Sequence, residues 1–385
     1  MSDMKSDCVT FRKIVFTAGF ILTAVAFAGC ALKGIKPAAS STATDPSDTS
    51  APVTTASESS TEDTTPTPTE APETETTTSD TEPATPTPTS GPLSVKVSFA
   101  GDCTLCSDAR GGSHFNRVVK KRWDYPFKKC KTYFQNDDLT LVNCEMAITN
   151  SKKYRKKAFV FAMKPEGIAM FKRAGIEAVN LANNHTLDFG QKGLKDTRKN
   201  LTKQKILWSD TSHYSIFTAK NGVKIGMCGY TSTGGLSKTY KLIKQLRSKG
   251  CQIVIVSCHW GKEGVYKQTS SQVSRGHKLI NHGADIVVGT HPHRLQPIEK
   301  YKGKYILYSI GNFCFGGHTN PKDPDTAIIQ CTFTLDESGK KVKSYKLNVI
   351  PYSLRSSKRG NDYCPKPYKK NSKAYKRVMK RLKWK

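Results

Sequence analysis

The chain changes from apolar to polar character within Ala178-Val-Asn-Leu-Ala-Asn-Asn-His185-Thr-Leu-Asp188-Phe-Gly190. The first residues form an apolar run that is typical of a buried strand, and the run breaks at two asparagines and His185. Asp188 and Gly190 then open a segment that we predict to be a helix. Ligands of open α/β sheets bind at the carboxyl ends of strands, so the sequence predicts a functional site at this strand end.

Four other apolar runs end in the same manner, each in an Asp, Glu or His residue. They are Val97-Ser-Phe-Ala-Gly-Asp102, Leu141-Val-Asn-Cys-Glu145, Ile253-Val-Ile-Val-Ser-Cys-His259 and Ile286-Val-Val-Gly-Thr-His291-Pro-His293. Five such endings in one chain indicate that a sheet collects these polar side chains into a single site.

The residue types at these strand ends are those of a metal centre. Carboxylate and amide oxygens together with neutral imidazoles bind divalent ions such as Mn, Fe or Zn. Two such ions can clamp a phosphoryl group and activate a water molecule. Pro292 favours an extended dipeptide that places two imidazoles near one another. We predict one or two metal ions, of undetermined identity, bound by Asp102, Glu145, Asn184, His259, His291 and His293, with His185 and Asp188 as catalytic acid–base groups.

The remaining pattern predicts an α/β fold. Strand-like runs alternate with helical segments from residue 93 to about residue 310, and two strands joined by a turn at 336–341 follow. This order predicts a sandwich of mixed sheets covered by helices. The basic tail 355–385 is a candidate polyanion-binding arm. The helical spacing of Tyr375, Val378 and Leu382 favours a docked C-terminal helix instead.

Residues 1–30 have the layout of a lipoprotein-type signal peptide. Three basic residues lie between Lys5 and Lys13, an apolar run follows from Ile14 to Phe27, and small residues precede Cys30. The run is shorter than the roughly 20 residues of a membrane span. We expect cleavage before Cys30 and lipidation of this cysteine, with an uncleaved N-terminal anchor as the alternative. In both cases the rest of the chain is expected to be extracytoplasmic and anchored to the cell membrane.

Residues 31–92 are rich in Thr, Pro, Ser and Glu and contain almost no residues that could form a core. Thr65-Pro-Thr-Pro-Thr69 recurs at 85–89. Such a composition predicts a disordered tether. The globular pattern begins at residue 93, and residues 93–385 are sufficient for one large domain.

The positive charge is concentrated in the globular part. Residues 93–385 hold 56 of the 61 Lys and Arg residues and 19 of the 31 Asp and Glu residues, a net charge of +37. A field of this strength attracts polyanions and anionic surfaces. The export signal argues against nucleic acid as the partner and favours an anionic envelope polymer. A basic surface that serves only solubility is the alternative.

Ten cysteines lie in the globular part, and their spacing shows no pair of zinc-ribbon C-x-x-C units. An even number outside the cell permits disulfides, and reduced thiols would explain the same set. Several of these cysteines fall inside strand-like runs, where a free thiol behaves as a small hydrophobe.

Residues 95–313 resemble the CapA family of poly-γ-glutamate capsule synthesis proteins, which is similar to the calcineurin-like metallophosphoesterase superfamily. The matching segments are Phe99-Ala-Gly-Asp102, Val142-Asn-Cys-Glu145, Asn180-Leu-Ala-Asn-Asn-His185 with Asp188 and Gly190, Cys258-His-Trp-Gly261 with Glu263, Gly289-Thr-His-Pro-His293 and Tyr308-Ser-Ile-Gly-Asn-Phe313. The resemblance implies a four-layer α/β/β/α sandwich with a metal-binding cleft. It also implies a role in the synthesis, export or anchoring of an anionic capsule polymer, alongside other capsule subunits.

The chain departs from the metallophosphoesterase pattern at three positions. Asp102-Cys-Thr104 stands in place of Asp-x-His, Asn143-Cys-Glu145 in place of Gly-Asp, and Asn183-Asn184-His185 in place of Gly-Asn-His. Two functions therefore remain open. One is a component that holds an anionic polymer such as poly-γ-glutamate, and the other is a metal-dependent phosphoesterase or amide hydrolase of envelope polymers.

Overall fold

The structure is a computed structural model that describes residues 91–384. The predicted signal peptide, Cys30 and the predicted tether up to residue 90 lie outside the described residues. Within residues 91–384, none of the helices combines the length and the apolar character needed to cross a membrane.

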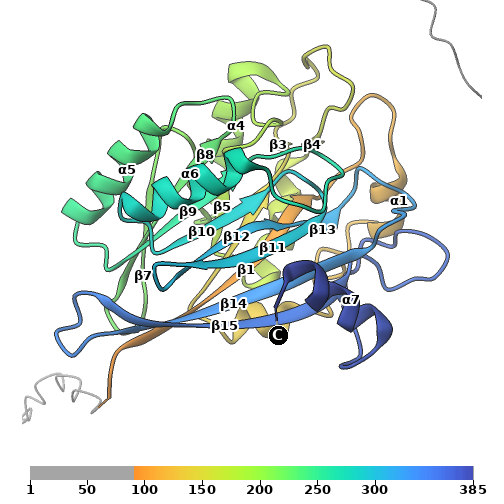
Figure 1. The fold of residues 1–385 in the computed structure, drawn as a ribbon. Coiled ribbons are helices and arrows are strands. Elements are labelled where there is room, and N and C mark those ends of the chain that lie inside the picture. Colours follow the sequence, from red (N-terminus) through yellow and green to blue (C-terminus); the bar gives the residue numbers. More distant parts are fainter. Residues whose placement is uncertain (1–90, 385) are drawn as a thin grey trace, which may run out of the picture. The chain divides into compact units, whose positions relative to one another are not determined.

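Two mixed β-sheets form the centre of the domain (Figure 1). The first has eight strands in the order β16-β15-β14-β1-β2-β5-β6, with β13 paired to β1. Its strands are β1 (Ser94–Thr104), β2 (Leu139–Cys144), β5 (Ala178–Asn180), β6 (Leu207–Ser209), β13 (Asn312–Phe315), β14 (Asp325–Leu335), β15 (Val342–Ser353) and β16 (Lys366–Pro367).

The second sheet has six strands in the order β11-β12-β10-β9-β8-β7. They are β7 (Ser215–Thr218), β8 (Lys224–Thr231), β9 (Ile253–His259), β10 (Ile286–Thr290), β11 (Leu295–Tyr301) and β12 (Lys304–Ile310). Strands β8, β9, β10 and β12 run parallel, and β7 and β11 are antiparallel edge strands. A separate two-stranded sheet pairs β3 (Ala147–Ile148) with β4 (Ala162–Met163).

Strand β9 shows why the two sheets pack face to face. All seven of its residues are buried, and its side chains alternate between two cores. Ile253 and Ile255 enter the core between the sheets, together with Val97 and Phe99 of β1. Val254, Val256 and Cys258 enter the core beneath the helices. The absence of polar residues from the first half of this strand therefore reflects burial on both faces.

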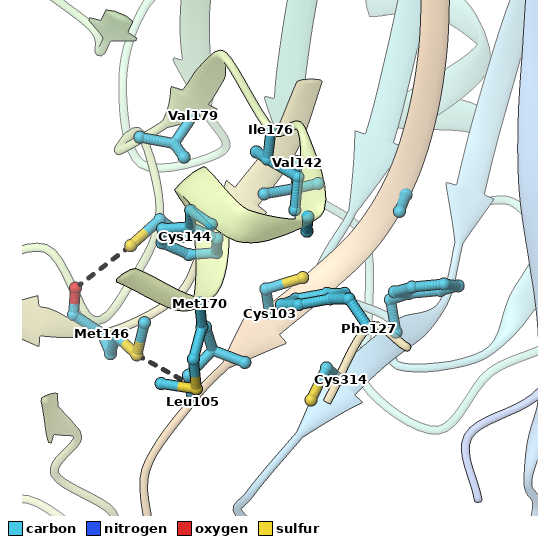
Figure 2. Close-up of a cluster of buried hydrophobic side chains, with 14 of the residues drawn as sticks. Cys103, Leu105, Phe127, Val142, Cys144, Met146, Met170, Ile176, Val179 and Cys314 are labelled. Atoms are coloured by element: carbon cyan, nitrogen blue, oxygen red, sulfur yellow. Dashed lines mark hydrogen bonds between the residues drawn. The ribbon is translucent and has the colours of Figure 1, made fainter. Parts of the chain in front are cut away.

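Helices cover the outer face of each sheet. Beneath the first sheet lie α1 (His114–Val119), α2 (Lys131–Gln135), the 3₁₀ helix η1 (Pro165–Ile168), α3 (Ala169–Ala174) and α4 (Gly190–Lys203), and over the second lie α5 (Leu236–Ser248) and α6 (Ser270–Asn281). Figure 2 shows the first of these cores, in which Cys103, Cys144 and Cys314 lie among Phe127 and Met170. These layers confirm the predicted four-layer α/β/β/α sandwich of mixed sheets.

The C-terminal tail forms α7 (Lys373–Leu382), as predicted. Val378 and Leu382 are buried in the core between the sheets, and the exposed face of the helix is basic. Helices α1 and α2 are short, and the backbone around them is irregular. Strands β11 and β13 and the short pair β3–β4 were not predicted, because their sequences lack a long apolar alternation.

Candidate metal centre

The ends of the parallel strands in both sheets meet at one edge of the sandwich. Asp102 lies within β1, Glu145 directly follows β2, and His259 is the last residue of β9. His291 follows β10, and Asn184 lies in the turn after β5. The structure therefore brings the predicted strand-end residues together from both sheets.

Two glycines allow the strands to approach closely at this edge. A Cβ atom on Gly101 would lie 1.9 Å from the carbonyl oxygen of Gly311, and one on Gly289 would lie 2.1 Å from that of Tyr308. The pairing of β1 with β2 also shifts register between Ala100 and Asp102. Such bulges occur next to functional sites, where they reorient a side chain, and here the shift falls at the first acidic residue of the site.

Asp102 is held between two neighbouring strand ends. Its Oδ1 accepts a hydrogen bond of 2.7 Å from Asn143 Nδ2, and its Oδ2 accepts one of 3.3 Å from the backbone N–H of His291. The Nδ1 atom of His293 lies 3.2 Å from Oδ2. The distance between Asp102 and His291 is thus short enough for both residues to belong to one site.

His259 lies at the centre of the cluster and is buried. Its Nε2 is 2.9 Å from Asn184 Oδ1 and 3.3 Å from Glu145 Oε1. Its Nδ1 is 3.0 Å from Thr290 Oγ1 and 3.3 Å from Asn143 Nδ2. The imidazole is therefore fixed in position on both of its nitrogen atoms.

Glu145 is fully buried, yet neither of its carboxylate oxygens has a hydrogen-bond partner. An unpaired buried carboxylate is costly, and proteins usually compensate such a group with a cation or a hydrogen-bond donor. Glu145 belongs to two groups of possible metal ligands, and within each group all the ligand atoms lie within 4.8 Å of one another. One group is Glu145 with His259 and His291, and the other is Glu145 with Asp102 and His293. The donor set and the unpaired oxygens fit a divalent metal ion.

The backbone at the histidine pair differs from the prediction. His291 and His293 both have positive φ values, 94° and 53°, so the expected extended dipeptide around Pro292 is wrong. Two non-glycine residues in this region store backbone strain, which is common at functional sites. The ring centroids of the two histidines are nevertheless 6.1 Å apart, and both face the carboxylates.

The charges of the site are strongly coupled. Burial, followed by the neighbouring charge of Asp102, raises the pKa of Glu145 well above its ordinary value. Burial lowers the pKa of His259 and His291, which favours the neutral imidazole that binds metals. For His293, burial acts in the opposite direction to the carboxyl groups of Glu145 and Asp102, which raise its pKa to about 10. The charge of His293 is therefore coupled to those of Asp102 and Glu145.

The two predicted acid–base residues form a pair beside the cluster. His185 Nδ1 lies 2.6 Å from Asp188 Oδ2, and Asp188 is fully buried. The other carboxylate oxygen of Asp188 lies 2.6 Å from Lys157 Nζ. Phe161 donates a backbone hydrogen bond of 2.9 Å to Asp188 and packs its ring against His185. Asp188 therefore orients the imidazole of His185.

Several residues of the site were not among the predicted ligands. Asn143 and Thr290 position Asp102 and His259, and Asn312 Oδ1 lies 2.7 Å from His293 Nδ1. Glu263 forms a further group of possible ligands with His291 and His293. Asn143 and Asn312 could have been identified, because each is an amide residue that ends or begins a buried apolar strand.

A known protein family covers most of the globular region. Residues 96–317, which include every predicted metal ligand, match the family described as Bacterial capsule synthesis protein PGA_cap. The chain belongs to this family.

Two relatives of this PGA_cap protein are known from Bacillus. The chain is 31% identical over 284 residues to the capsule biosynthesis protein CapA of Bacillus anthracis, covering 66% of this chain and 67% of the relative. It is 28% identical over 315 residues to the PGA biosynthesis protein CapA of Bacillus subtilis, covering 75% and 77%. The predicted membership of the CapA family is confirmed.

Solved structures similar to this PGA_cap protein include a phosphatase from Mycoplasma pneumoniae. The two share 20% sequence identity at a TM-score of 0.41, covering 68% of this chain and 95% of the other. TT1561 of Thermus thermophilus shares 9% identity at a TM-score of 0.39, covering 68% and 100%.

Proposed function

We propose that this protein is a metal-dependent component of the synthesis, export or anchoring of an anionic capsule polymer of the poly-γ-glutamate type. Membership of the PGA_cap family supports the capsule-related role. The finer assignment rests on the candidate metal ligands at the polar edge of the sandwich and on the strongly positive net charge of the domain. The net charge of +37 on residues 93–385 favours an anionic polymer as the bound partner.

The observation that carries the metal assignment is the pair of unpartnered oxygens on buried Glu145. Asp102, Asn184, His259, His291 and His293 would hold the ion or ions together with this carboxylate. A bound divalent ion polarises the group it contacts and lowers the pKa of a bound water. Glu145 and Asp102 would supply the negative charge, and the histidines and Asn184 would complete the neutral part of the donor set.

A specific observation favours a hydrolytic role as the second candidate. The imidazole of His185 is oriented by Asp188 and borders the proposed metal centre, as expected of a group that transfers a proton. In this reading the domain cleaves a phosphoester or an amide of an envelope polymer. The Asp188 carboxylate holds His185 in one orientation, so that Nε2 can exchange a proton with substrate.

The place of action belongs to the same proposal. Residues 1–30 would direct export, lipid on Cys30 would anchor the protein to the membrane, and residues 31–92 would act as a tether. Other capsule subunits would be neighbours of the domain at the membrane. Mass spectrometry of the membrane-bound protein tests this, because an intact Met1 terminus would contradict cleavage before Cys30.

Metal analysis of the purified full-length chain tests the central proposal. We expect one or two equivalents of a divalent metal, lost on Glu145→Ala. A panel of phosphodiesters and poly-γ-glutamate, assayed with that metal, separates the two candidates. Polymer binding without turnover supports the capsule component alone, and turnover abolished by His185→Ala supports the hydrolase. A metal content that is negligible under all loading conditions would refute the metal centre.

A further inference from the structure

One basic loop lies beside the candidate metal centre, and apart from Lys157 its side chains have no role in the site described above. We define it as residues 152–159, which begin Lys-Lys-Tyr-Arg-Lys-Lys and include five positive charges within six residues. No acidic residue occurs between Glu145 and Glu166 to balance them. The loop is neither helix nor strand, and most of its residues are exposed.

The loop is tied directly to the turn that carries Asn184 and Asp188. Lys157 Nζ contacts Asp188 Oδ1 at 2.6 Å and the carbonyl oxygen of Asn184 at 3.0 Å. The backbone N–H of Arg155 donates a hydrogen bond of 2.8 Å to the carbonyl oxygen of Asp188. The position of the loop relative to the metal centre is therefore fixed at its C-terminal half.

The other four positive side chains of the loop are unpaired. Among the described residues, no hydrogen bond or salt bridge engages the side chains of Lys152, Lys153, Arg155 or Lys156. Arg155 lines a cleft of about 740 Å³ whose other walls include Asn184, His259 and His291. A free guanidinium in the cleft of the metal centre can bind a carboxylate through two parallel hydrogen bonds.

Two aromatic rings frame the same loop. Tyr154 and Phe159 are 47% and 52% exposed, and they are two of the three large hydrophobic side chains that are exposed in the described part of the chain. Tyr154 packs edge-on against Phe189, and Phe159 stacks on Phe161, which itself contacts His185. The rings hold the loop against the domain, and about half of each side chain remains exposed to a ligand.

We infer that the basic loop is the recognition element for a linear polycarboxylate chain, of the poly-γ-glutamate type, and that Arg155 directs one carboxylate into the metal cleft. An extended row of unpaired cations matches the repeating charge of such a chain. The exposed rings can cover the methylene groups between its carboxylates. This inference rests on the proposed polymer function and identifies the residues that select the polymer.

The test compares two triple variants that lower the charge equally. Lys152→Gln, Lys153→Gln and Lys156→Gln remove three unpaired cations from the basic loop. The matched control, Lys343→Gln, Lys346→Gln and Lys376→Gln, changes exposed lysines of β15 and α7. Binding of fluorescent poly-γ-glutamate to the full-length chain is measured by anisotropy at low ionic strength. We expect the loop variant to raise the Kd about tenfold and the control to change it less than twofold.

Arg155→Gln provides a second, single-residue measurement. We expect it to weaken binding severalfold, and Arg155→Lys to restore only part of the loss because an ammonium lacks the paired donors of a guanidinium. Equal Kd values for the loop and control triples would overturn the inference. Tighter binding of single-stranded DNA than of poly-γ-glutamate to the unmodified chain would overturn the polycarboxylate assignment.

The thermal shift on addition of Mn²⁺ is recorded for the same proteins, so that the two proposals fail separately. The loop inference predicts an unchanged shift in both triple variants, because none of the six lysines is a proposed ligand. A shift missing from every protein, including the unmodified chain, would refute the metal centre while the binding comparison still decides the role of the loop. A shift lost only in the loop variant would show that the loop acts through the metal centre and would overturn its role as an independent recognition element.

Discussion

Replacing Glu145 by Gln should separate the stability of the metal-free domain from its response to metal. Both carboxylate oxygens of Glu145 are buried without a hydrogen-bond partner. Leaving such a group unsatisfied costs about 1–3 kcal/mol. Gln has the same shape and no charge, so the substitution removes a charge whose burial, together with the nearby charge of Asp102, raises the pKa of Glu145. The metal-free variant should therefore be at least as stable as the unmodified protein.

The metal response should change in the opposite direction. A ligand present at 100 times its Kd stabilises the folded state by about 2.7 kcal/mol. For a domain of about 290 residues, with an unfolding entropy of about 2.1 cal/mol/K per residue, this corresponds to a rise in Tm of about 4–5 °C. Gln is a neutral and weaker ligand than a carboxylate, so Glu145→Gln should lose most of this increase.

The assay is thermal unfolding of the full-length chain after treatment with EDTA, with and without added Mn²⁺ or Zn²⁺. Glu166→Gln is the matched control, because it makes the same chemical change at an exposed residue of η1. A full metal-induced increase in Tm in the Glu145→Gln variant would refute the ligand role. A metal-free variant that is more than about 2 kcal/mol less stable than the parent would refute the argument from unsatisfied oxygens.

Three further substitutions test the site and the fold. Asp188→Asn should retain the metal content that Glu145→Ala loses, because Asp188 contacts His185 and Lys157 rather than the proposed ion; metal analysis of both variants decides this. Burial, with a smaller effect of a nearby acid, raises the pKa of Glu177 to about 7. The contribution of Glu177 to the free energy of unfolding therefore falls as the pH rises towards and above 7. Denaturant unfolding at pH 5 and pH 8 measures this effect. The unfolding free energy of Glu177→Gln, relative to that of the parent, should rise by about 2 kcal/mol from pH 5 to pH 8. An equal difference between variant and parent at both pH values would contradict the raised pKa. Leu382→Ala should destabilise the domain by about 2–5 kcal/mol, because this fully buried side chain of α7 enters the core between the sheets; a loss below 1 kcal/mol would indicate that α7 is only loosely docked.

Much of the fold could be predicted from local pattern. The apolar run from Ile253 predicted a buried strand, and β9 is buried on both faces because its side chains alternate between two cores. The spacing of Val378 and Leu382 likewise predicted a docked helix. Strand β13 could not be predicted, because four residues carry no periodicity and the strand exists through its pairing with Asp102 and Thr104 of β1.

The site could be predicted as a set of residues but not as a geometry. Strand ends predicted which carboxylates and imidazoles would meet, since parallel strands deliver their ends to one edge. The conformation of His291 and His293 could not be predicted, because their positive φ values are imposed by the surrounding structure. The contact between Lys157 and Asp188 spans 31 residues and depends on the path of a loop without regular structure.

The ten cysteines of the described region are all buried and free of disulfide bonds. Burial raises the pKa of Cys144 to about 12 and that of Cys103 further still, so the reactive thiolate is scarce in the native state. Protection of this kind exists only once the layers have closed. A nascent or unfolded chain presents the same sulfurs to any oxidant, and a wrong pairing would prevent these buried side chains from packing. The domain is thus chemically durable after folding but vulnerable during it, and the order in which folding and exposure to oxidant occur should determine the yield of active protein.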